Sequence, residues 1–481
     1  MRSGKMKKED GIEKKAANRE ILFVTYFFVS IFAVLMGYFA YFIAFQSDEV
    51  INNSYNPRQD LLASQVIRGE IQGSKGEVLA ETVTKGGTEV RRYPYDCTFS
   101  HVVGSFDKGK TGIELSENFR LLTSHTNVFS QFLLQAKGEK VAGDNIITTL
   151  DVELQKTAHD ALGTKKGAVV ALDPNTGKIL ALVSKPDYDP NQILSEWDSL
   201  VDDTENESAL VNRATQGLYP PGSTFKIITA LEYVREHPDD YGEYSYNCTG
   251  NGGFSGVQIK CYGNERHGKV DLKHSLSESC NTSFANLGTT LDKESFRGLC
   301  DNLLFNKPLP LNMAYKKSSF VIDKNTDDSQ MPQTVIGQGK TQITPMHNCM
   351  ITAAIANGGT MMKPYVIDSI ETSGGSKVKK YLPETYADVM SAEEAALLTD
   401  MMQEVVDSGT GSRLSDLSYP VAGKTGSAEY DSSKASHAWF VGFAPADKPE
   451  IAVCVIVEGA GTGSAYAVPI AKRVFTNYLG N

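Results

Sequence analysis

Ser223 and Lys226 are the residues whose types and spacing most directly indicate chemistry. They lie in the segment Tyr219-Pro-Pro-Gly-Ser-Thr-Phe-Lys226. Pro and Gly interrupt the preceding chain, and apolar residues at helical spacing then predict a helix over residues 224–236. Residues three apart on a helix have Cβ atoms about 5–6 Å apart, so the Lys226 amine can reach the Ser223 hydroxyl.

This pair could form an activated nucleophile. A serine hydroxyl is a weak nucleophile until a base takes its proton, and a lysine can act as that base only when it is neutral. Burial and a second nearby cation would lower the lysine pKa from about 10.4, and the positive end of the helix would stabilise developing negative charge. The pattern Ser-x-x-Lys is weak by itself, because it also occurs at Ser105 and Ser376 without a helix start.

Two more short patterns follow in the same predicted domain, namely Ser279-Cys-Asn281 and Lys424-Thr-Gly-Ser427. The first lies at a predicted connection between helices, and the second lies at the edge of a predicted strand. Each is common alone, and Lys-Thr-Gly also occurs at Lys110. The three motifs in this order, each in a suitable setting, make a highly specific combination.

The elements that must position these residues form a predicted α+β fold. Two apolar strands, 167–173 and 178–184, flank a Pro-Asn-Thr-Gly turn and predict an antiparallel hairpin. The strands predicted near the end of the chain, before a helix at 467–478, are 424–430, 437–444 and 451–458. A sheet built from both ends of a domain, with helices inserted between, is an α+β sandwich.

Residues 21–45 contain no charged side chain and are long enough to cross a bilayer as a helix. A buried core helix is the alternative, but the segment is apolar on every face and follows Lys14, Lys15 and Arg19. These cations keep the N-terminus in the cytoplasm. The segment lacks the small-residue exit of a cleaved signal peptide, so we expect an uncleaved anchor with the rest of the chain outside the cytoplasm.

The sequence therefore predicts four parts: a cytoplasmic tail (1–20), a transmembrane anchor (21–45), an extracytoplasmic stalk (46–150) and a larger domain (151–481). Short apolar runs broken by glycines predict hairpins in the stalk. The net charge of −11 includes a basic tail with seven Lys/Arg and four Asp/Glu. The remaining chain is acidic and would repel a phosphate backbone, so nucleic acid is excluded as a partner.

The three motifs together resemble those of the penicillin-binding proteins, specifically the class B transpeptidases of peptidoglycan synthesis. Further matching stretches are Arg68-Gly-Glu-Ile71, His267-Gly268, Gly337-Gln-Gly339 and Thr344-Pro345. The resemblance covers nearly the whole chain. It implies a penicillin-binding and serine β-lactamase-like transpeptidase domain, an antiparallel sheet flanked by helices, carried on the anchor and a small strand-rich stalk.

The resemblance also implies a role for each motif residue. Ser223 would attack the D-Ala–D-Ala bond of a stem peptide to form an acyl-enzyme, Lys226 would take its proton, and Ser279 would relay that proton to the departing D-Ala. The implied substrate-binding residues are Asn281, Lys424, Thr425, Gly426 and Ser427. The backbone N–H groups of Ser223 and Ser427 would hold the oxyanion, and β-lactams would acylate the same serine.

The implied partners are peptidoglycan stem peptides on lipid-linked or nascent glycan, β-lactams, and a membrane glycan polymerase of the shape, elongation, division and sporulation (SEDS) family. No cofactor is expected for catalysis. A D,D-carboxypeptidase, in which water replaces the acceptor amine, is one alternative activity. A serine β-lactamase is a second, but no Glu between Ser279 and Lys424 has the Asn four residues later that the best-known class needs. A penicillin sensor would need a cytoplasmic effector, and the tail is too short to fold.

A cluster of metal-ligand residue types lies around the second motif. Its members, spaced C-x12-C-x5-H-x12-C, are Cys248, Cys261, His267 and Cys280. Three thiolates and one imidazole suit a closed structural zinc site. The alternatives are a Cys248–Cys261 disulfide and unpaired buried thiols, since seven cysteines cannot all pair. We expect Cys280 to point away from the substrate side of its loop.

Overall fold

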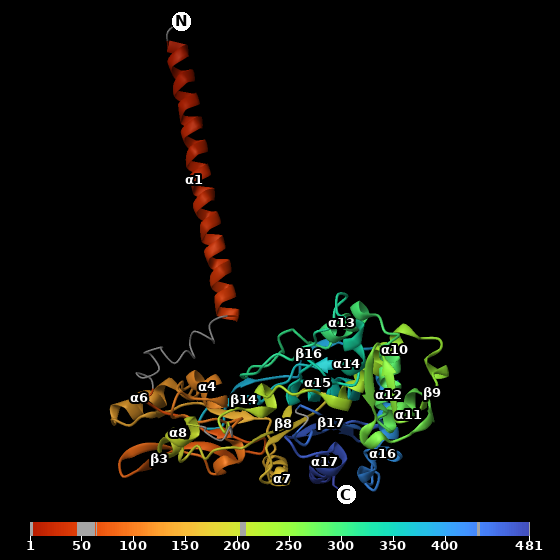
Figure 1. Ribbon diagram of the computed structural model, residues 1–481. Coiled ribbons are helices and arrows are strands. Elements are labelled where there is room, and N and C mark those ends of the chain that lie inside the picture. Colours follow the sequence, from red (N-terminus) through yellow and green to blue (C-terminus); the bar gives the residue numbers. More distant parts are fainter. Residues whose placement is uncertain (1–2, 46–62, 64, 203–207, 431–432, 481) are drawn as a thin grey trace. The chain divides into compact units, whose positions relative to one another are not determined.

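The computed structural model describes residues 3–45, 63, 65–202, 208–430 and 433–480 (Figure 1). The chain divides into two compact units, Met1–Leu62 and Ala63–Asn481. The first part of the predicted stalk, residues 46–62, lies outside the described residues. The second unit runs across residue 150 without a division. The boundary that the sequence predicts there, between the stalk and the larger domain, therefore stays a prediction.

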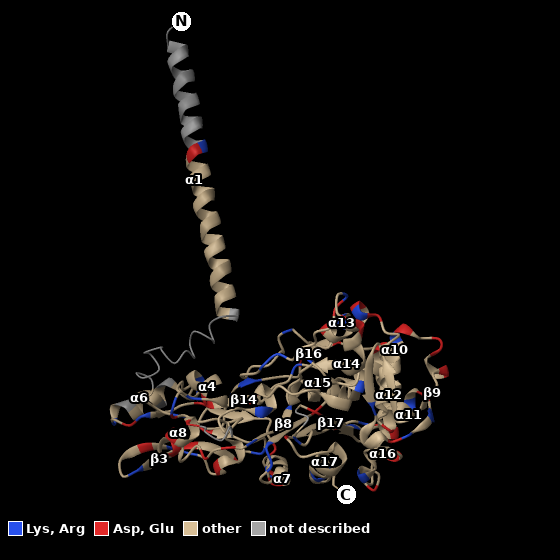
Figure 2. Ribbon diagram, in the orientation of Figure 1, with Lys and Arg blue, Asp and Glu red and all other residues tan. Residues whose placement is uncertain are grey.

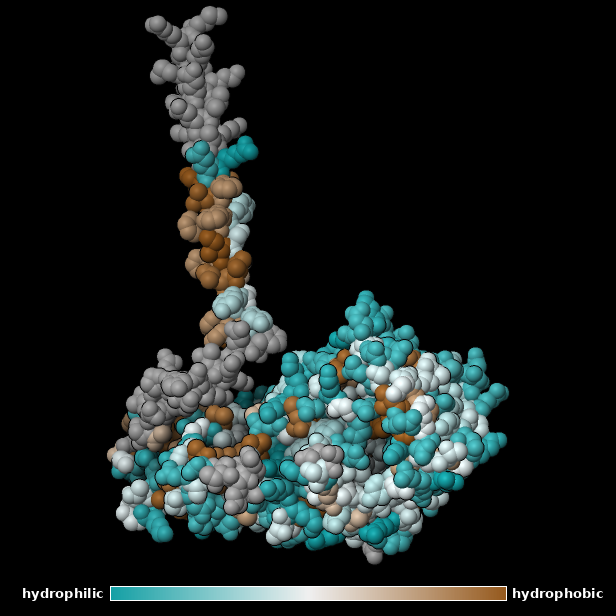
Figure 3. All heavy atoms as spheres, viewed as in Figure 1, coloured by the Kyte–Doolittle hydropathy of each residue, from teal (hydrophilic) through white to brown (hydrophobic). Residues whose placement is uncertain are grey.

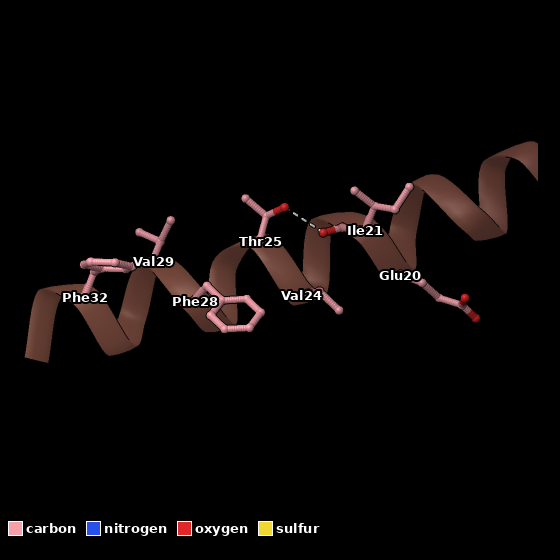
Figure 4. Close-up of a pocket in the computed structure, with 7 residues that line it drawn as sticks. All are labelled: Glu20, Ile21, Val24, Thr25, Phe28, Val29 and Phe32. Atoms are coloured by element: carbon pink, nitrogen blue, oxygen red, sulfur yellow. Dashed lines mark hydrogen bonds between the residues drawn. The ribbon is translucent and has the colours of Figure 1, made fainter.

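The first unit contains one long helix, α1 (Ser3–Phe45). Within it, Arg19–Ile43 has a mean hydropathy of 2.2 and none of its side chains is buried by the protein. No charged side chain follows Glu20 in the described part of this helix (Figure 2), and large apolar side chains are exposed along it from Ile21 to Ile43 (Figure 3). The Thr25 hydroxyl donates to the Ile21 carbonyl at 2.7 Å, so even this polar group is satisfied within the helix (Figure 4). Among the described residues, α1 is long and apolar enough to cross a membrane.

An antiparallel sheet of five strands, in the order β17-β18-β19-β7-β8, forms the centre of the second unit. Its strands are β7 (Gly167–Leu172), β8 (Ile179–Lys185), β17 (Ala422–Ala428), β18 (His437–Ala444) and β19 (Ile451–Val457). The α+β prediction is confirmed, and so is the assembly of the sheet from the two ends of the domain. The strand predicted at 424–430 begins and ends two residues earlier, because Ala422 and Gly423 also pair with β18.

Helices cover both faces of this sheet. Every residue of β7, β18 and β19 is buried, as expected for strands packed on both sides. One face carries Val169 and Val453 and packs on α7 (Val152–Leu162) and α17 (Gly463–Leu479). The opposite face packs on α15 (Pro345–Ala356), which lies on the other side of the sheet from α17 in Figure 1.

The region between β8 and β17 supplies most of the described helices of the second unit. Its helices are α8 (Ile193–Val201), α9 (Arg213–Gln216), α10 (Lys226–Glu236), α11 (Leu272–Ser277), α12 (Asn281–Gly288), α13 (Lys293–Asn302), α14 (Met331–Thr334) and α16 (Ala392–Asp407). Single 3-10 turns are η2 (Gly222–Phe225), η3 (Tyr241–Glu243), η4 (Tyr262–Asn264), η5 (Asp328–Gln330) and η6 (Ser412–Leu414). The ring centroid of Phe225 lies 5.9 Å from each of three other ring centroids, those of Phe296, Phe305 and Phe320. This aromatic cluster fixes the start of α10 in the core.

The predicted stalk contributes to a second sheet with the order β15-β14-β6-β2-β3-β4. Its strands are β2 (Ile71–Gln72), β3 (Val78–Lys85), β4 (Thr88–Arg92), β6 (Asn145–Thr148), β14 (Ile367–Glu371) and β15 (Lys377–Lys380). Because β14 pairs with β6, chain from the larger predicted domain completes the stalk sheet. Buried Glu114 accepts hydrogen bonds from Arg68 and Arg91, each at 2.7 Å, which anchors this region internally.

The remaining elements are short. Small two-stranded sheets pair β1 (Val66–Ile67) with β5 (Val141–Ala142), β9 (Tyr246–Cys248) with β12 (Gly268–Val270), β10 (Asn251–Phe254) with β11 (Val257–Lys260), and β13 (Thr360–Met362) with β16 (Thr385–Asp388). The stalk also contains η1 (Asp96–Phe99), α4 (Gly112–Ser116), α5 (Asn118–Leu121) and α6 (Val128–Ala136). The sheets formed by β9 to β12 carry the cysteine cluster that the sequence singles out.

Candidate active site

Ser223 lies in η2, the tight turn that leads into α10, as the Pro-Gly interruption predicts. The predicted helix over 224–236 therefore begins as a 3-10 turn and becomes α-helical at Lys226. Gly222 has φ +53°, and a Cβ there would come within 3.0 Å of the Ser427 carbonyl oxygen. The backbone N–H of Gly222 donates to the Gly337 carbonyl at 2.9 Å. The turn that presents Ser223 is thus held between the third motif and the Gly337-Gln-Gly339 stretch.

Lys226 is completely buried, and its amine lies against the second motif. Nζ donates to the Ser279 carbonyl and to Asn281 Oδ1, both at 2.7 Å. A neutral amine has two N–H bonds, so these two acceptors use both of them and leave its lone pair available. The third neighbour is the Ser279 hydroxyl, at 3.3 Å.

Ser279 connects the two lysines of the site. Its hydroxyl accepts a hydrogen bond from Lys424 Nζ at 2.9 Å and lies 3.3 Å from Lys226 Nζ. Its φ of +55° is uncommon for a residue other than glycine, and it turns the chain between α11 and α12. This turn points Ser279 and Asn281 toward Lys226.

The two lysines are buried amines that share one hydroxyl. Burial lowers the pKa of Lys226 to about 8, although the neighbouring Cys280 and Cys261 partly oppose the shift. Burial also lowers the pKa of Lys424 well below its ordinary value, and the charge of Lys226 lowers it further. Two protonated amines this close would repel each other, so the site favours at least one neutral amine near neutral pH.

The third motif runs along β17, an edge strand of the central sheet. Lys424 is buried and Ser427 is partly exposed. A Cβ on Gly426 would lie 3.2 Å from Thr224 Cγ2, next to the serine turn. The structure therefore brings the segments 223–226, 279–281 and 424–427 together at one place, as the sequence predicts.

The hydrogen bonds of Lys226 go to the second motif, and one contributing residue lies outside the sequence motifs. Within the described chain, no hydrogen bond joins Lys226 to Ser223, because the lysine amine is taken by the second motif. The missed residue is Thr410, whose hydroxyl lies 2.6 Å from the hydroxyl of Thr425. Thr410 lies in a Ser-Gly-Thr-Gly turn after α16, and a turn composition alone does not indicate contact with the site.

Trp439 and His437 lie behind the site. Trp439 is wholly buried, and its indole N–H donates to the Pro220 carbonyl at 3.1 Å, which holds the segment before the serine turn. His437 is also buried. It accepts a hydrogen bond from the Gly459 N–H at 3.1 Å and stacks on Tyr430 with ring centroids 4.0 Å apart.

The four predicted metal-ligand residues also come together. Cys248 ends β9, Cys261 follows β11, His267 precedes β12, and Cys280 caps the N-terminus of α12. Their ligand atoms all lie within 4.8 Å of one another. The Cys248 sulfur lies 3.6 Å from the Cys261 sulfur, and all seven cysteines are free thiols in this structure. The Cys280 sulfur lies 3.8 Å from the Cys261 sulfur.

Two family sequence models match successive parts of the second unit. A sequence model described as the penicillin binding protein transpeptidase domain matches residues 167–476. A second model, described as the penicillin binding protein A dimerisation domain, matches residues 68–146.

Curated relatives and solved structures are similar over most of the chain. The peptidoglycan D,D-transpeptidase PbpA of Mycolicibacterium smegmatis is 32% identical, over 86% of this chain and 89% of that protein. Penicillin-binding protein A of M. tuberculosis, solved as its ceftriaxone acyl-enzyme, is 31% identical with a TM-score of 0.79, over 88% of this chain and 100% of that chain. A D,D-transpeptidase domain of a peptidoglycan glycosyltransferase from Eggerthella lenta is 29% identical with a TM-score of 0.77. The match covers 86% of this chain and 98% of that chain.

Proposed function

The chain belongs to the penicillin-binding protein transpeptidases, and from this premise we propose that it is a membrane-anchored D,D-transpeptidase that crosslinks peptidoglycan stem peptides through an acyl-enzyme on Ser223. The observation that carries the proposal is the meeting of Lys226 and Lys424 at the Ser279 hydroxyl, beside the turn that presents Ser223. This arrangement supplies a nucleophile, a neutral amine and a proton path in one place.

Acylation would proceed as a proton-coupled attack. The Ser223 oxygen attacks the carbonyl between the two terminal D-Ala residues, and the lone pair of neutral Lys226 takes the hydroxyl proton. The tetrahedral oxyanion is held by the backbone N–H groups of Ser223 and Ser427. The Ser279 hydroxyl then passes a proton to the departing D-Ala nitrogen, and Lys226 restores that proton. The ester bond forms as the peptide bond breaks.

The third motif supports binding of the substrate's terminal carboxylate. Lys424 supplies positive charge, and the hydroxyls of Thr425 and Ser427 supply hydrogen-bond donors. Gly426 has no side chain, so a substrate backbone can lie against the edge strand β17. Asn281 accepts from Lys226 through its amide oxygen and donates to the Lys260 carbonyl at 2.8 Å, and its second amide N–H would orient the donor peptide.

The second half of the reaction decides between crosslinking and trimming. An amine from a neighbouring stem peptide attacks the ester carbonyl and forms a new peptide bond. The ester bond breaks, and the proton lost by the amine passes to the Ser223 oxygen, which returns Ser223 to its free form. Water in place of the amine would give a carboxypeptidase product. β-Lactams acylate the same serine and persist, because no leaving group departs to make room for the acceptor.

The apolar helix α1 supports the membrane anchor in this proposal. In this proposal the N-terminus lies in the cytoplasm and the catalytic unit lies outside it, which the seven Lys and Arg side chains of residues 1–20 support. A SEDS-family glycan polymerase in the membrane is the proposed partner, because crosslinking acts on newly made glycan. Co-purification of such a polymerase with the full chain, but not with a chain carrying an unrelated anchor, tests this pairing.

A structural zinc ion is proposed at Cys248, Cys261, His267 and Cys280. Zinc bonds of about 2.3 Å to sulfur and 2.0–2.1 Å to nitrogen place tetrahedral ligand atoms roughly 3.5–3.8 Å apart. The observed separations of 3.6 Å (Cys248–Cys261) and 3.8 Å (Cys261–Cys280) fit this requirement, and the 3.3 Å from Cys248 Sγ to His267 Nδ1 is slightly shorter than it. When bound, the ion would hold the hairpins against the start of α12 and thereby fix the second motif.

Labelling with a fluorescent penicillin tests the nucleophile. The wild-type chain and Ser376→Ala are expected to label equally, because Ser376 lies in another Ser-x-x-Lys pattern but is exposed in a loop. Ser223→Ala is expected to lose all labelling while keeping its fold by circular dichroism. Persistent labelling of a folded Ser223→Ala chain would contradict the proposal.

A further inference from the structure

Three side chains of different chemistry meet at a second place, outside the candidate active site. They are Cys97 from η1, His159 from α7 and Asp187 from the segment after β8. One sulfur, one nitrogen and one oxygen from these residues all lie within 4.8 Å of one another. His159 Nε2 lies 3.9 Å from Cys97 Sγ and 2.8 Å from Asp187 Oδ2.

The fold holds the three segments in place independently of this cluster. The 3-10 turn η1 packs against both α7 and β8. Gln155 lies one turn before His159 on α7 and is fully buried. Its amide nitrogen donates to the carbonyls of Thr98 and Leu182, each at 2.9 Å. One buried glutamine on α7 therefore fixes the backbone next to Cys97 and the strand β8 that leads to Asp187.

The thiol and the carboxylate converge on the same imidazole nitrogen. A neutral imidazole nitrogen offers either one N–H or one lone pair, and here Nε2 lies at hydrogen-bond distance from Asp187 Oδ2 and farther from the Cys97 sulfur. A metal ion accepts all three donors at once. The other ring nitrogen, Nδ1, lies 3.4 Å from Asp160 Oδ1, and a carboxylate at this position is the usual partner of a metal-bound histidine.

We propose that Cys97, His159 and Asp187 form a second binding site for a zinc-class divalent cation. A thiolate, a carboxylate and a neutral imidazole suit zinc, and the two negative charges neutralise the ion. The side chains of His159 and Asp187 are 14% and 20% exposed, so an ion can enter and a water can take the fourth position. The Lys185 amine donates to the Gly163 carbonyl at 2.6 Å.

The site would tie two matched regions of the chain together. Cys97 lies within the part that matches the dimerisation-domain model, and Asp187 lies within the part that matches the transpeptidase model. Among the described residues, no hydrogen bond or ion pair joins any of these three side chains to a residue of the three motifs. The role is therefore structural, and it stands or falls separately from the proposed transpeptidase activity.

Metal counting on the full chain in detergent tests the proposal. Wild-type protein and the variants are stripped with a chelator, dialysed against zinc chloride and then metal-free buffer, and analysed for zinc per chain. Cys97→Ser and Asp187→Asn are expected to hold one equivalent fewer than the wild type. Asp202→Asn is the control, because it removes the same charge as Asp187→Asn at an exposed position outside the cluster. Its zinc content is expected to match that of the wild type.

A second measurement keeps the proposal testable if a variant is less stable. Zinc at about 100 times its dissociation constant is expected to raise the folding equilibrium constant of the wild type roughly 100-fold more than that of Cys97→Ser in urea unfolding. Equal zinc content, or an equal response to zinc, in wild type and Cys97→Ser would overturn the site and leave a plain His159–Asp187 ion pair. Fluorescent penicillin labelling is expected in every variant, so loss of the metal is distinguishable from failure of the active site.

Discussion

The acylation rate is expected to depend on pH through Lys226. Burial lowers the pKa of this lysine to about 8, so only the neutral fraction can take the proton of Ser223. That fraction is about one hundredth at pH 6, about one tenth at pH 7 and one half near pH 8. Because the neutral form increases with pH, acylation should rise about tenfold from pH 6 to 7, about fivefold from pH 7 to 8, and level off above pH 9.

Stopped-flow mixing with a fluorescent penicillin measures this profile as the second-order rate constant for acylation. Circular dichroism at each pH confirms that the chain stays folded. Lys226→Arg is the matched variant, since an arginine keeps its charge throughout the range. It is expected to lose roughly 100- to 10,000-fold in rate, typical of general base removal, and to lose the rise with pH. A wild-type rate that is flat from pH 6 to 8 would refute the assignment of Lys226 as the base.

Three further outcomes follow from contacts in the structure. Thr410→Val removes the hydroxyl that meets Thr425 and should slow acylation about fivefold to tenfold, with Thr410→Ser near the wild-type rate. Gly337→Ala should lower the free energy of unfolding by about 2 kcal/mol or more in urea, since φ is +75° and the new Cβ would lie 1.9 Å from the Gly222 carbonyl oxygen. Deletion of residues 1–45 should leave penicillin acylation unchanged but abolish recovery of the protein with membranes in flotation assays.

Much of the central sheet could be predicted from sequence because its signals are local. The strand 437–444 is observed as β18 (His437–Ala444), and the hairpin at Pro174-Asn-Thr-Gly177 is observed between β7 and β8. Continuous apolar runs mark strands buried on both faces, and the Pro-Gly interruption marks the start of the serine turn.

The parts that sequence could not give depend on contacts between distant segments. β14 completes the stalk sheet by pairing with β6, more than 200 residues earlier, and no local pattern encodes that pairing. The left-handed backbone at Ser279 and the Thr410–Thr425 contact likewise exist only in the folded chain. Spacing alone indicated that the Lys226 amine can reach the Ser223 hydroxyl, but it could not show that this amine donates to the Ser279 carbonyl and to Asn281 Oδ1.

The central claim is that Ser223 carries the donor peptide while peptidoglycan is crosslinked. It is tested most directly by giving the full chain nascent, uncrosslinked glycan strands and separating the digested products by mass. The account predicts crosslinked dimers from the wild type and from Ser376→Ala, and none from Ser223→Ala. Trimmed monomers alone from the wild type, or dimers that persist with Ser223→Ala, would contradict it.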